Sequence, residues 1–168
     1  KPFPIKAITY SVTPIGKSPD RGTWNVSRDW QWVDTNNNQL HDGFEESFID
    51  ENENCLLDGN ETVVGDGKLL KDMGVNTLRA YHHLYSKDFF RKIYKEYGLH
   101  ILCGDLLGGY AMGSGATWAE GTNYSDARQQ EAMLASVTEM VEAYKDEPYI
   151  LMWVLGNENV YGVANNSN

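Results

Sequence analysis

The sequence contains the same joint twice: an amphipathic stretch, then a glycine, then a run of apolar residues. The two joints are Met73-Gly74-Val75 and Tyr97-Gly98-Leu99, and they lie 24 residues apart. A glycine at such a place ends a helix, because it accepts the left-handed backbone conformation that a helix cap requires. This repeat predicts an α/β fold in which helices alternate with the strands of a parallel sheet.

Seven elements in the order βαβαβαβ are expected from the apolar patterns. The expected strands are 5–12, 75–81, 99–105 and 149–155, and the expected helices are 67–73, 86–97 and one that starts at Ser125 or Asp126 and stops before Pro148. The last strand is seven consecutive apolar residues, so we expect it to be buried on both faces.

This order favours a (β/α) barrel or a doubly wound sheet. No G-x-G-x-x-G follows the first strand, which disfavours a dinucleotide-binding fold. A complete (β/α)8 TIM barrel takes about 250 residues. If a chain of 168 residues that also contains an insert is a barrel, it is therefore half of one. The family resemblance given below implies that this half is the N-terminal one, with strands 1–4 only.

Composition limits the classes of partner. The formal net charge is −10, and this balance argues against a nucleic-acid partner, since phosphate binding depends on clustered basic residues. No apolar run reaches the roughly 18 residues that a membrane-spanning helix needs. Two cysteines cannot form a disulfide framework, and Cys103, within an apolar run, is expected to be a buried thiol.

An acidic segment, residues 34–61, contains nine acids and no Lys or Arg. It carries the pattern D-x-N-x-N-x-L-x-D-G-x-E twice, with a repeat of 16 residues. Oxygen ligands at positions 1, 3, 5, 9 and 12, with a backbone carbonyl at 7, suit Ca²⁺. The expected ligands are Asp34, Asn36, Asn38, Leu40, Asp42 and Glu45 in the first loop, and Asp50, Asn52, Asn54, Leu56, Asp58 and Glu61 in the second.

These loops resemble EF-hand loops with one departure, because position 6 is Gln39 and Cys55 instead of glycine. Only four residues separate them, too few for the flanking helices of an EF-hand pair. We therefore expect a tandem calcium-binding insert after the first strand, holding two structural Ca²⁺ ions and no organic cofactor. An unliganded acidic loop is the alternative. Calcium loops in an acidic chain fit an extracellular or periplasmic location.

The stretch Trp153–Asn159 brings a carboxylate, Glu158, directly after the last expected strand, between two amides. Functional groups of a barrel gather at the carboxyl ends of its strands. A glutamate held there can act as a general acid. The alternative is a loop carboxylate that accepts backbone hydrogen bonds.

Residues 67–162 resemble retaining glycosidases whose barrels carry an Asn-Glu pair after the fourth strand. The resemblance rests on residues 71–81, similar to a GxNxxRxY pattern, on residues 89–105, and on Asn157-Glu158. It is strongest to the fungal β-1,3-glucanosyltransferases and to the barrel domain of the β-galactosidase/β-glucuronidase family. The resemblance implies a glycoside hydrolase or transglycosylase that acts on a β-linked oligo- or polysaccharide by double displacement.

The resemblance also implies roles for individual residues. Glu158 would be the general acid/base, and Asn157 would hydrogen-bond the 2-hydroxyl of the sugar. Arg79 would hold the nucleophilic carboxylate from beneath the site. Five residues could contact sugar, with packing or loop hydrogen bonds as the alternative for each: Tyr81, His82, Asp105, Tyr110 and Trp118.

One expected component is absent from these residues. A retaining mechanism needs a second carboxylate about 5–5.5 Å away, and in the resembled enzymes it follows strand seven. We therefore expect the chain alone to be inactive, and its partner to be the C-terminal half-barrel or a second copy of itself. Two other hypotheses are a non-catalytic carbohydrate- or partner-binding barrel and a calcium-dependent structural or adhesion module.

Overall fold

The computed structural model describes residues 2–10, 44, 51–52, 58–81 and 87–160. The chain forms two units, one of residues 1–9 and 77–168 and the other of residues 10–76. The elements of the first unit are strands β1 (Ala7–Thr9), β2 (Thr77–Ala80), β3 (His100–Asp105) and β4 (Ile150–Leu155), helices α3 (Lys87–Tyr97) and α4 (Ala127–Tyr144), and the 3₁₀ turn η1 (Gly109–Ala111). Helix α2 (Asp66–Asp72) belongs to the second unit.

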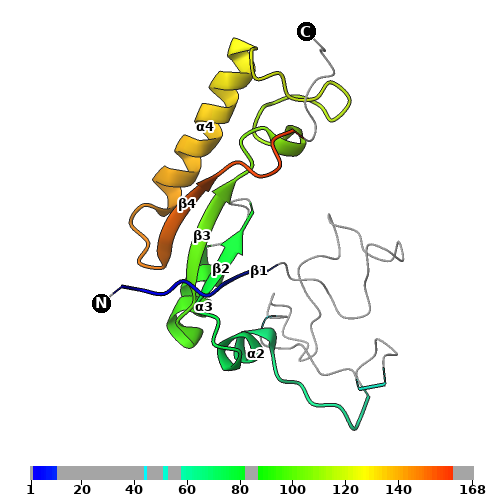
Figure 1. Cartoon of the computed structure of the whole chain (residues 1–168), viewed down its shortest axis with the longest axis vertical. Helices are drawn as coiled ribbons and strands as arrows, with labels where there is room; N and C mark the ends of the chain where they lie inside the picture. The colour runs from blue at the N-terminus through cyan, green and yellow to red at the C-terminus, as the bar shows by residue number, and fades with distance from the viewer. Residues whose placement is uncertain (1, 11–43, 45–50, 53–57, 82–86, 161–168) are drawn as a thin grey trace. The chain divides into compact units, whose positions relative to one another are not determined.

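The four strands form one parallel sheet in the order β1-β2-β3-β4 (Figure 1). Ala7 lies opposite Thr77, and Thr77 lies opposite His100. Parallel strands that neighbour one another in chain order, joined by helices, are the arrangement of a (β/α)8 barrel. The predicted fold is therefore confirmed: the chain has the α/β architecture of the first half of a TIM barrel.

The core of the first unit lies between the sheet and helices α3 and α4. Phe90 and Ile93 of α3 are buried, and the Phe90 ring contacts Tyr144 at 6.1 Å and Tyr149 at 5.7 Å between centroids. Met133 and Met140 complete the buried side of α4. Right-handed β-α-β crossovers place successive helices on one face of a sheet. These aromatic contacts therefore fasten both helices to the start of β4.

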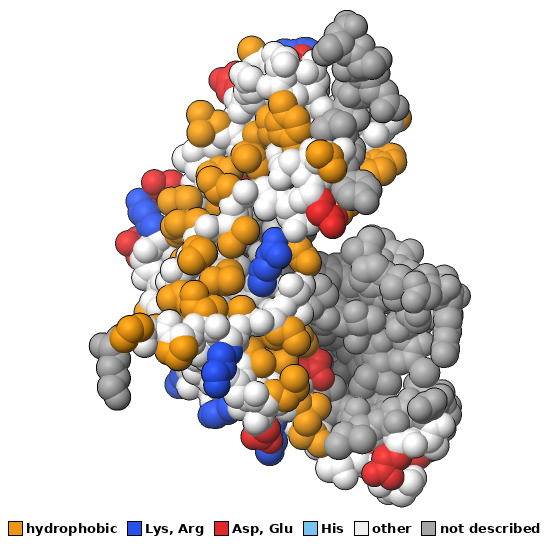
Figure 2. All heavy atoms as spheres, viewed as in Figure 1, with side chains coloured by type: hydrophobic (Ala, Val, Ile, Leu, Met, Phe, Trp, Pro, Cys, Tyr) orange, Lys and Arg blue, Asp and Glu red, His pale blue; other side chains and the backbone are white. Residues whose placement is uncertain are grey.

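The fourth strand differs from the prediction. We expected β4 to be buried on both faces, but none of its residues is fully buried, and Met152 and Leu155 are 49% and 55% exposed. The reason is that, among the described residues, β4 pairs with β3 alone and has no neighbour along its other edge. Figure 2 shows hydrophobic side chains gathered along the sheet on the face turned to the viewer.

The predicted helix ends agree with the structure where it describes them. Gly74 and Gly98 have φ of 81° and 70°, and the amide of Gly98 donates to the carbonyl of Tyr94. Asp126 caps α4, since its carboxylate accepts from the backbone amides of Arg128 and Gln129. The expected start of α3 at residue 86 and the end of the first strand at 11–12 lie outside the described residues.

Cys103 is buried in the middle of β3, as its apolar surroundings predicted. Burial and the nearby Asp105 raise the pKa of this thiol to about 12. Within the described ranges, no helix is both long and apolar enough to cross a membrane.

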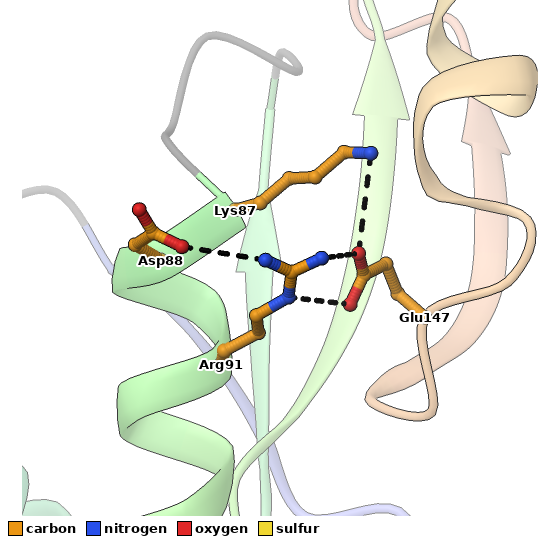
Figure 3. Close-up of polar contacts among 4 residues, drawn as sticks. All are labelled: Lys87, Asp88, Arg91 and Glu147. Atoms are coloured by element: carbon orange, nitrogen blue, oxygen red, sulfur yellow. Dashed lines mark hydrogen bonds and ion pairs between the residues drawn. The ribbon is translucent and has the colours of Figure 1, made fainter.

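An ion-pair cluster joins α3 to the turn before β4 (Figure 3). The guanidinium of Arg91 donates to both carboxylate oxygens of Glu147, at 2.6 and 3.1 Å. Lys87 lies 3.9 Å from the same carboxylate, and Asp88 lies 3.3 Å from Arg91. The hydrogen bond from Arg91 holds the pKa of Glu147 below its ordinary value. This cluster fixes the approach of the chain to β4.

Candidate functional site

The carboxyl ends of β2 and β4 are joined by one side-chain hydrogen bond. Arg79, on β2, donates from Nη2 to the Oδ1 of Asn157 at 2.9 Å. The guanidinium carbon of Arg79 also lies 4.7 Å from the centre of the Tyr81 ring, a cation–π distance. Because the strands are parallel, residues 79 and 157 meet at the same edge even though 78 positions separate them.

Glu158 follows Asn157 and is exposed. Its backbone has φ of 47°, a left-handed conformation that is uncommon for a residue with a side chain. The hydroxyl of Tyr110 donates to Oε2 of Glu158. Tyr110 is in turn stacked on Trp118, with ring centroids 6.5 Å apart and planes 11° apart. The long loop after β3 thus presents an aromatic pair beside the carboxylate.

That loop has a polar interior of its own. Thr122 and Ser114 are buried, and the Thr122 hydroxyl contacts the Ser114 hydroxyl at 2.9 Å and the carbonyl of Gly108 at 2.6 Å. The outer part is exposed: 66% of the Trp118 surface faces solvent. The lower part of the loop is therefore held by buried hydrogen bonds, while the flat indole of Trp118 is accessible. An accessible flat ring of this kind can stack on a sugar ring.

Asn159 fastens the loop after β4 to the loop after β3. Its amide nitrogen donates to the carbonyls of Leu106 and Leu107, at 3.1 and 2.8 Å, and to the Tyr124 hydroxyl at 3.0 Å. The Tyr124 hydroxyl also contacts the carbonyl of Leu107 at 3.0 Å. Sequence reasoning gave neither Asn159 nor Tyr124 a role. The only available signal was the amide that directly follows Glu158.

Asp105, at the end of β3, is 1% exposed. Its carboxylate accepts from the backbone amide of Leu107 at 2.7 Å and from the hydroxyl of Ser136 at 2.6 Å. The backbone carbonyl of Asp105 accepts from the amide of Gly156 at 2.8 Å. These bonds favour the structural alternative, in which Asp105 organises the loops on both sides instead of contacting sugar.

The structure brings six predicted site residues to one end of the sheet, in two contacting groups. The first group is Arg79, Asn157 and Tyr81, and the second is Glu158, Tyr110 and Trp118. His82 lies outside the described residues. The carboxyl group of Glu158 is exposed, so in its protonated form it can donate a proton to a substrate oxygen. The neighbouring Asn157, bonded to Arg79, can bind hydroxyl groups.

Most of the predicted calcium ligands lie outside the described residues, and only Asn52, Asp58 and Glu61 are described. The amide of Asn52 donates to Asp58 at 2.7 Å. The carboxylate of Glu61 accepts from the backbone amides of Glu51 and Asp58, at 3.0 and 2.9 Å. No group of three or more His, Cys, Asp or Glu side chains suited to a metal occurs within the part of the chain that the structure describes. The calcium loops therefore stay a prediction.

Comparison with known proteins shows the family of the chain. The sequence profile of the family described as "Glycosyl hydrolases family 2, TIM barrel domain" matches residues 55–167, a range that includes Arg79, Asn157 and Glu158. A beta-galactosidase from Alteromonas mediterranea is 26% identical over 168 residues. The alignment covers 96% of this chain and 15% of that protein, so the chain spans a small part of its relative. No solved structure matches the chain.

Proposed function

Because the chain belongs to the TIM barrel domain family of the family 2 glycosyl hydrolases, we propose that it forms the acid/base side of a β-glycosidase active site. The observation that carries this proposal is the placement of Glu158 and Asn157 directly after β4, with Asn157 bonded to Arg79 of β2. Family membership alone gives the general class, a glycosidase. The residue roles and the mechanism that follow are our proposal.

In the first step of this mechanism, Glu158 is protonated and donates its proton to the glycosidic oxygen as the bond from that oxygen to the sugar breaks. A carboxylate nucleophile forms a covalent bond to the sugar on the opposite face. In the second step, Glu158 removes a proton from water or an acceptor hydroxyl, which attacks the sugar and releases the nucleophile. The stereochemistry of the sugar is thereby retained.

Asn157 and Arg79 act in this scheme as a pair. Asn157 hydrogen-bonds the 2-hydroxyl of the sugar, a contact that strengthens toward the oxocarbenium-like transition state. The bond from Arg79 occupies Oδ1 of Asn157, which leaves its amide nitrogen to donate to the sugar. The other N–H groups of the Arg79 guanidinium are suited to donate to a carboxylate. We expect that carboxylate, the nucleophile, from polypeptide outside residues 1–168, so that these residues alone do not turn over a glycoside.

The relative supports a choice of first substrate. It is described as a beta-galactosidase, so β-galactosides are the first substrates to test on the full-length polypeptide that contains this chain. Glu158→Gln should lower kcat/KM for an alkyl β-galactoside by about 10²–10⁴-fold, the usual contribution of a general acid. A 2,4-dinitrophenyl β-galactoside should be cleaved with nearly unchanged kcat/KM, because that leaving group departs without a proton.

A matched control is Glu142→Gln, the same chemical change on the exposed side of α4. It should leave both substrates unaffected. If Glu158→Gln hydrolyses alkyl β-galactosides and other alkyl β-glycosides at the wild-type rate, the acid/base assignment is wrong.

We also propose that the insert binds two Ca²⁺ ions with a structural role. In its support, three predicted ligand residues of the second loop, Asn52, Asp58 and Glu61, form one hydrogen-bonded group, and their amide and carboxylate oxygens are the kind that Ca²⁺ prefers. Bound ions would offset the repulsion among the nine acids of residues 34–61. Use of such loops also supports our proposal of an extracellular or periplasmic location.

Calorimetric titration with Ca²⁺ tests the insert. The wild-type chain should bind two ions, and Asp34→Ala and Asp50→Ala should each remove one site. Added Ca²⁺ should raise the melting temperature of the wild type more than that of either variant, since a ligand that binds only the folded state stabilises it. Absence of binding heat in the wild type would reject the calcium interpretation and favour a solvated acidic loop.

A further inference from the structure

The non-glycine residues with positive φ are concentrated at one place in the described part of the chain. They are Leu107, Tyr110, Ala111 and Glu158, with φ of 47°, 57°, 60° and 47°. The first three lie in the loop after β3, and the fourth lies directly after β4. Left-handed conformations of such residues persist only where their surroundings hold them, and they cluster at functional sites. The contacts around Glu158 hold these left-handed residues in place.

Two kinds of contact act on Glu158. Its side chain accepts the hydroxyl of Tyr110 on Oε2. Its backbone is fixed by the next residue, Asn159, whose amide bonds to Leu106, Leu107 and Tyr124 across the two loops. The left-handed residues Leu107 and Tyr110 are therefore members of the same network that positions Glu158.

We propose that Tyr110 and Asn159 are positioning residues that hold the carboxyl of Glu158 in the orientation for proton transfer. This inference rests on the proposed glycosidase function. Neither residue needs to touch the reacting atoms. Tyr110 fixes the side chain, and Asn159 fixes the left-handed backbone from which that side chain projects.

One chemical consequence is specific to this arrangement. Because the Tyr110 hydroxyl occupies Oε2, the proton that goes to the glycosidic oxygen is carried on Oε1, and the same atom later accepts the proton of water. A rigid donor is efficient because catalysis depends on the reacting atoms being held in line, and a displacement of about 1 Å can cost about 100-fold in rate. Stacking of Tyr110 on Trp118 keeps the phenol itself in place.

The test uses the leaving-group dependence of kcat/KM in the full-length polypeptide that contains this chain. Tyr110→Phe keeps the ring and its stack on Trp118 but removes the hydroxyl. We expect kcat/KM for an alkyl β-galactoside to fall about 10- to 100-fold. For a 2,4-dinitrophenyl β-galactoside, which needs no proton in this step, the value should stay within about twofold.

Asn159→Ser, which removes the amide that spans the loops, should show the same selective loss. The matched control is Tyr94→Phe, on α3, whose ring contacts His100 at the start of β3. That strand end lies about 16 Å along β3 from Asp105, so the control should leave both substrates unchanged.

The outcomes separate this inference from the proposed function. If Glu158→Gln loses alkyl β-galactoside cleavage but Tyr110→Phe does not, the positioning role of Tyr110 is wrong and the acid/base role stands. If Tyr110→Phe lowers kcat/KM equally for both substrates, its effect is general, and the positioning role is also rejected. If Glu158→Gln itself has no effect on either substrate, the proposed function fails first.

Discussion

The two ends of the sheet use the left-handed backbone conformation differently. Before β2 and β3 the chain enters through Gly74 and Gly98, where a missing side chain makes the conformation nearly free of strain. After β3 and β4 the same conformation is also taken by four residues that carry side chains, among them Tyr110 and Glu158. At the entry end the left-handed positions are glycines. At the exit end, residues with side chains also adopt this strained conformation.

This difference agrees with the division of labour in a barrel, where the carboxyl ends of the strands carry function and the amino ends support the fold. At the exit end the strain is balanced by side-chain hydrogen bonds: the carboxylate of Asp105 accepts from Leu107 and from Ser136 of α4, and Asn159 donates across to the loop after β3. At the entry end the described ties are hydrophobic contacts and the ion-pair cluster in which Arg91 and Lys87 face Glu147. Three stability measurements test whether the two ends differ in this way.

The largest effect is expected at Asp105. Asp105→Ala removes the acceptor of two part-buried hydrogen bonds, from the amide of Leu107 and from the hydroxyl of Ser136, which should lower the free energy of unfolding by about 2–3 kcal/mol. Urea unfolding measures this loss. Asp105→Asn, which keeps an acceptor oxygen, should cost clearly less. If Asp105→Ala is as stable as the wild type, hydrogen bonds do not hold the exit end.

A smaller effect, with a contrast between the two ends, is expected from exchanging alanine and glycine. Gly98→Ala meets no atom within 4 Å but must adopt φ of 70°, so it should cost about 1 kcal/mol. Ala111→Gly should be nearly neutral, because relief of the left-handed penalty offsets the greater backbone entropy of glycine. Ala135→Gly, on the exposed side of α4, should cost about 1 kcal/mol and serves as the control.

The comparison is weakened if Ala111→Gly destabilises as much as Ala135→Gly does. That result would mean that residue 111 is not strained in solution. Thermal unfolding of the three variants, measured side by side, is sufficient to decide this.

The smallest effect is expected at the ion pair. Arg91→Ala should destabilise the protein less than Asp105→Ala and Gly98→Ala do, since Arg91 is half exposed and its pair with Glu147 is screened by solvent. Arg91 holds the pKa of Glu147 below its ordinary value of 4.5. The carboxylate therefore contributes stability above that pH, and the contribution disappears as the pH falls through the lowered pKa.

The difference in stability between wild type and Arg91→Ala should accordingly be present at neutral pH and vanish well below pH 4.5. Urea unfolding at both pH values measures it. A difference that persists in acid would show that Arg91 acts by packing its side chain and not by its charge.

Much of the fold could be predicted from the sequence, because its elements are determined locally. The glycines at 74 and 98 and the cap at Asp126 mark helix ends by backbone chemistry that needs no distant partner. The burial of β4 was predicted wrongly. An apolar run shows that the strand is compatible with burial on both faces. Its actual exposure depends on which strands lie beside it.

For the candidate site, the sequence indicated where functional residues lie but not how they contact one another. Strand ends could be located from the apolar pattern, which indicated Glu158. The roles of Arg79 and Asn157 were implied by the resemblance to retaining glycosidases. The bond from Tyr110 to Glu158 and the clamp formed by Asn159 cross between loops 35 or more residues apart. Such contacts depend on left-handed backbone conformations at residues such as Leu107, which no local pattern predicts.

The buried thiol of Cys103 can report when the strands of the sheet separate. A sulfur with so high a pKa, enclosed in β3, reacts with alkylating reagents only when neighbouring strands separate and water enters. In a Cys55→Ser variant, Cys103 is the one remaining cysteine of the sequence, so the rate of alkylation measures how often the strands separate. Reagent consumption over hours would then report how often β3 separates from its neighbours β2 and β4.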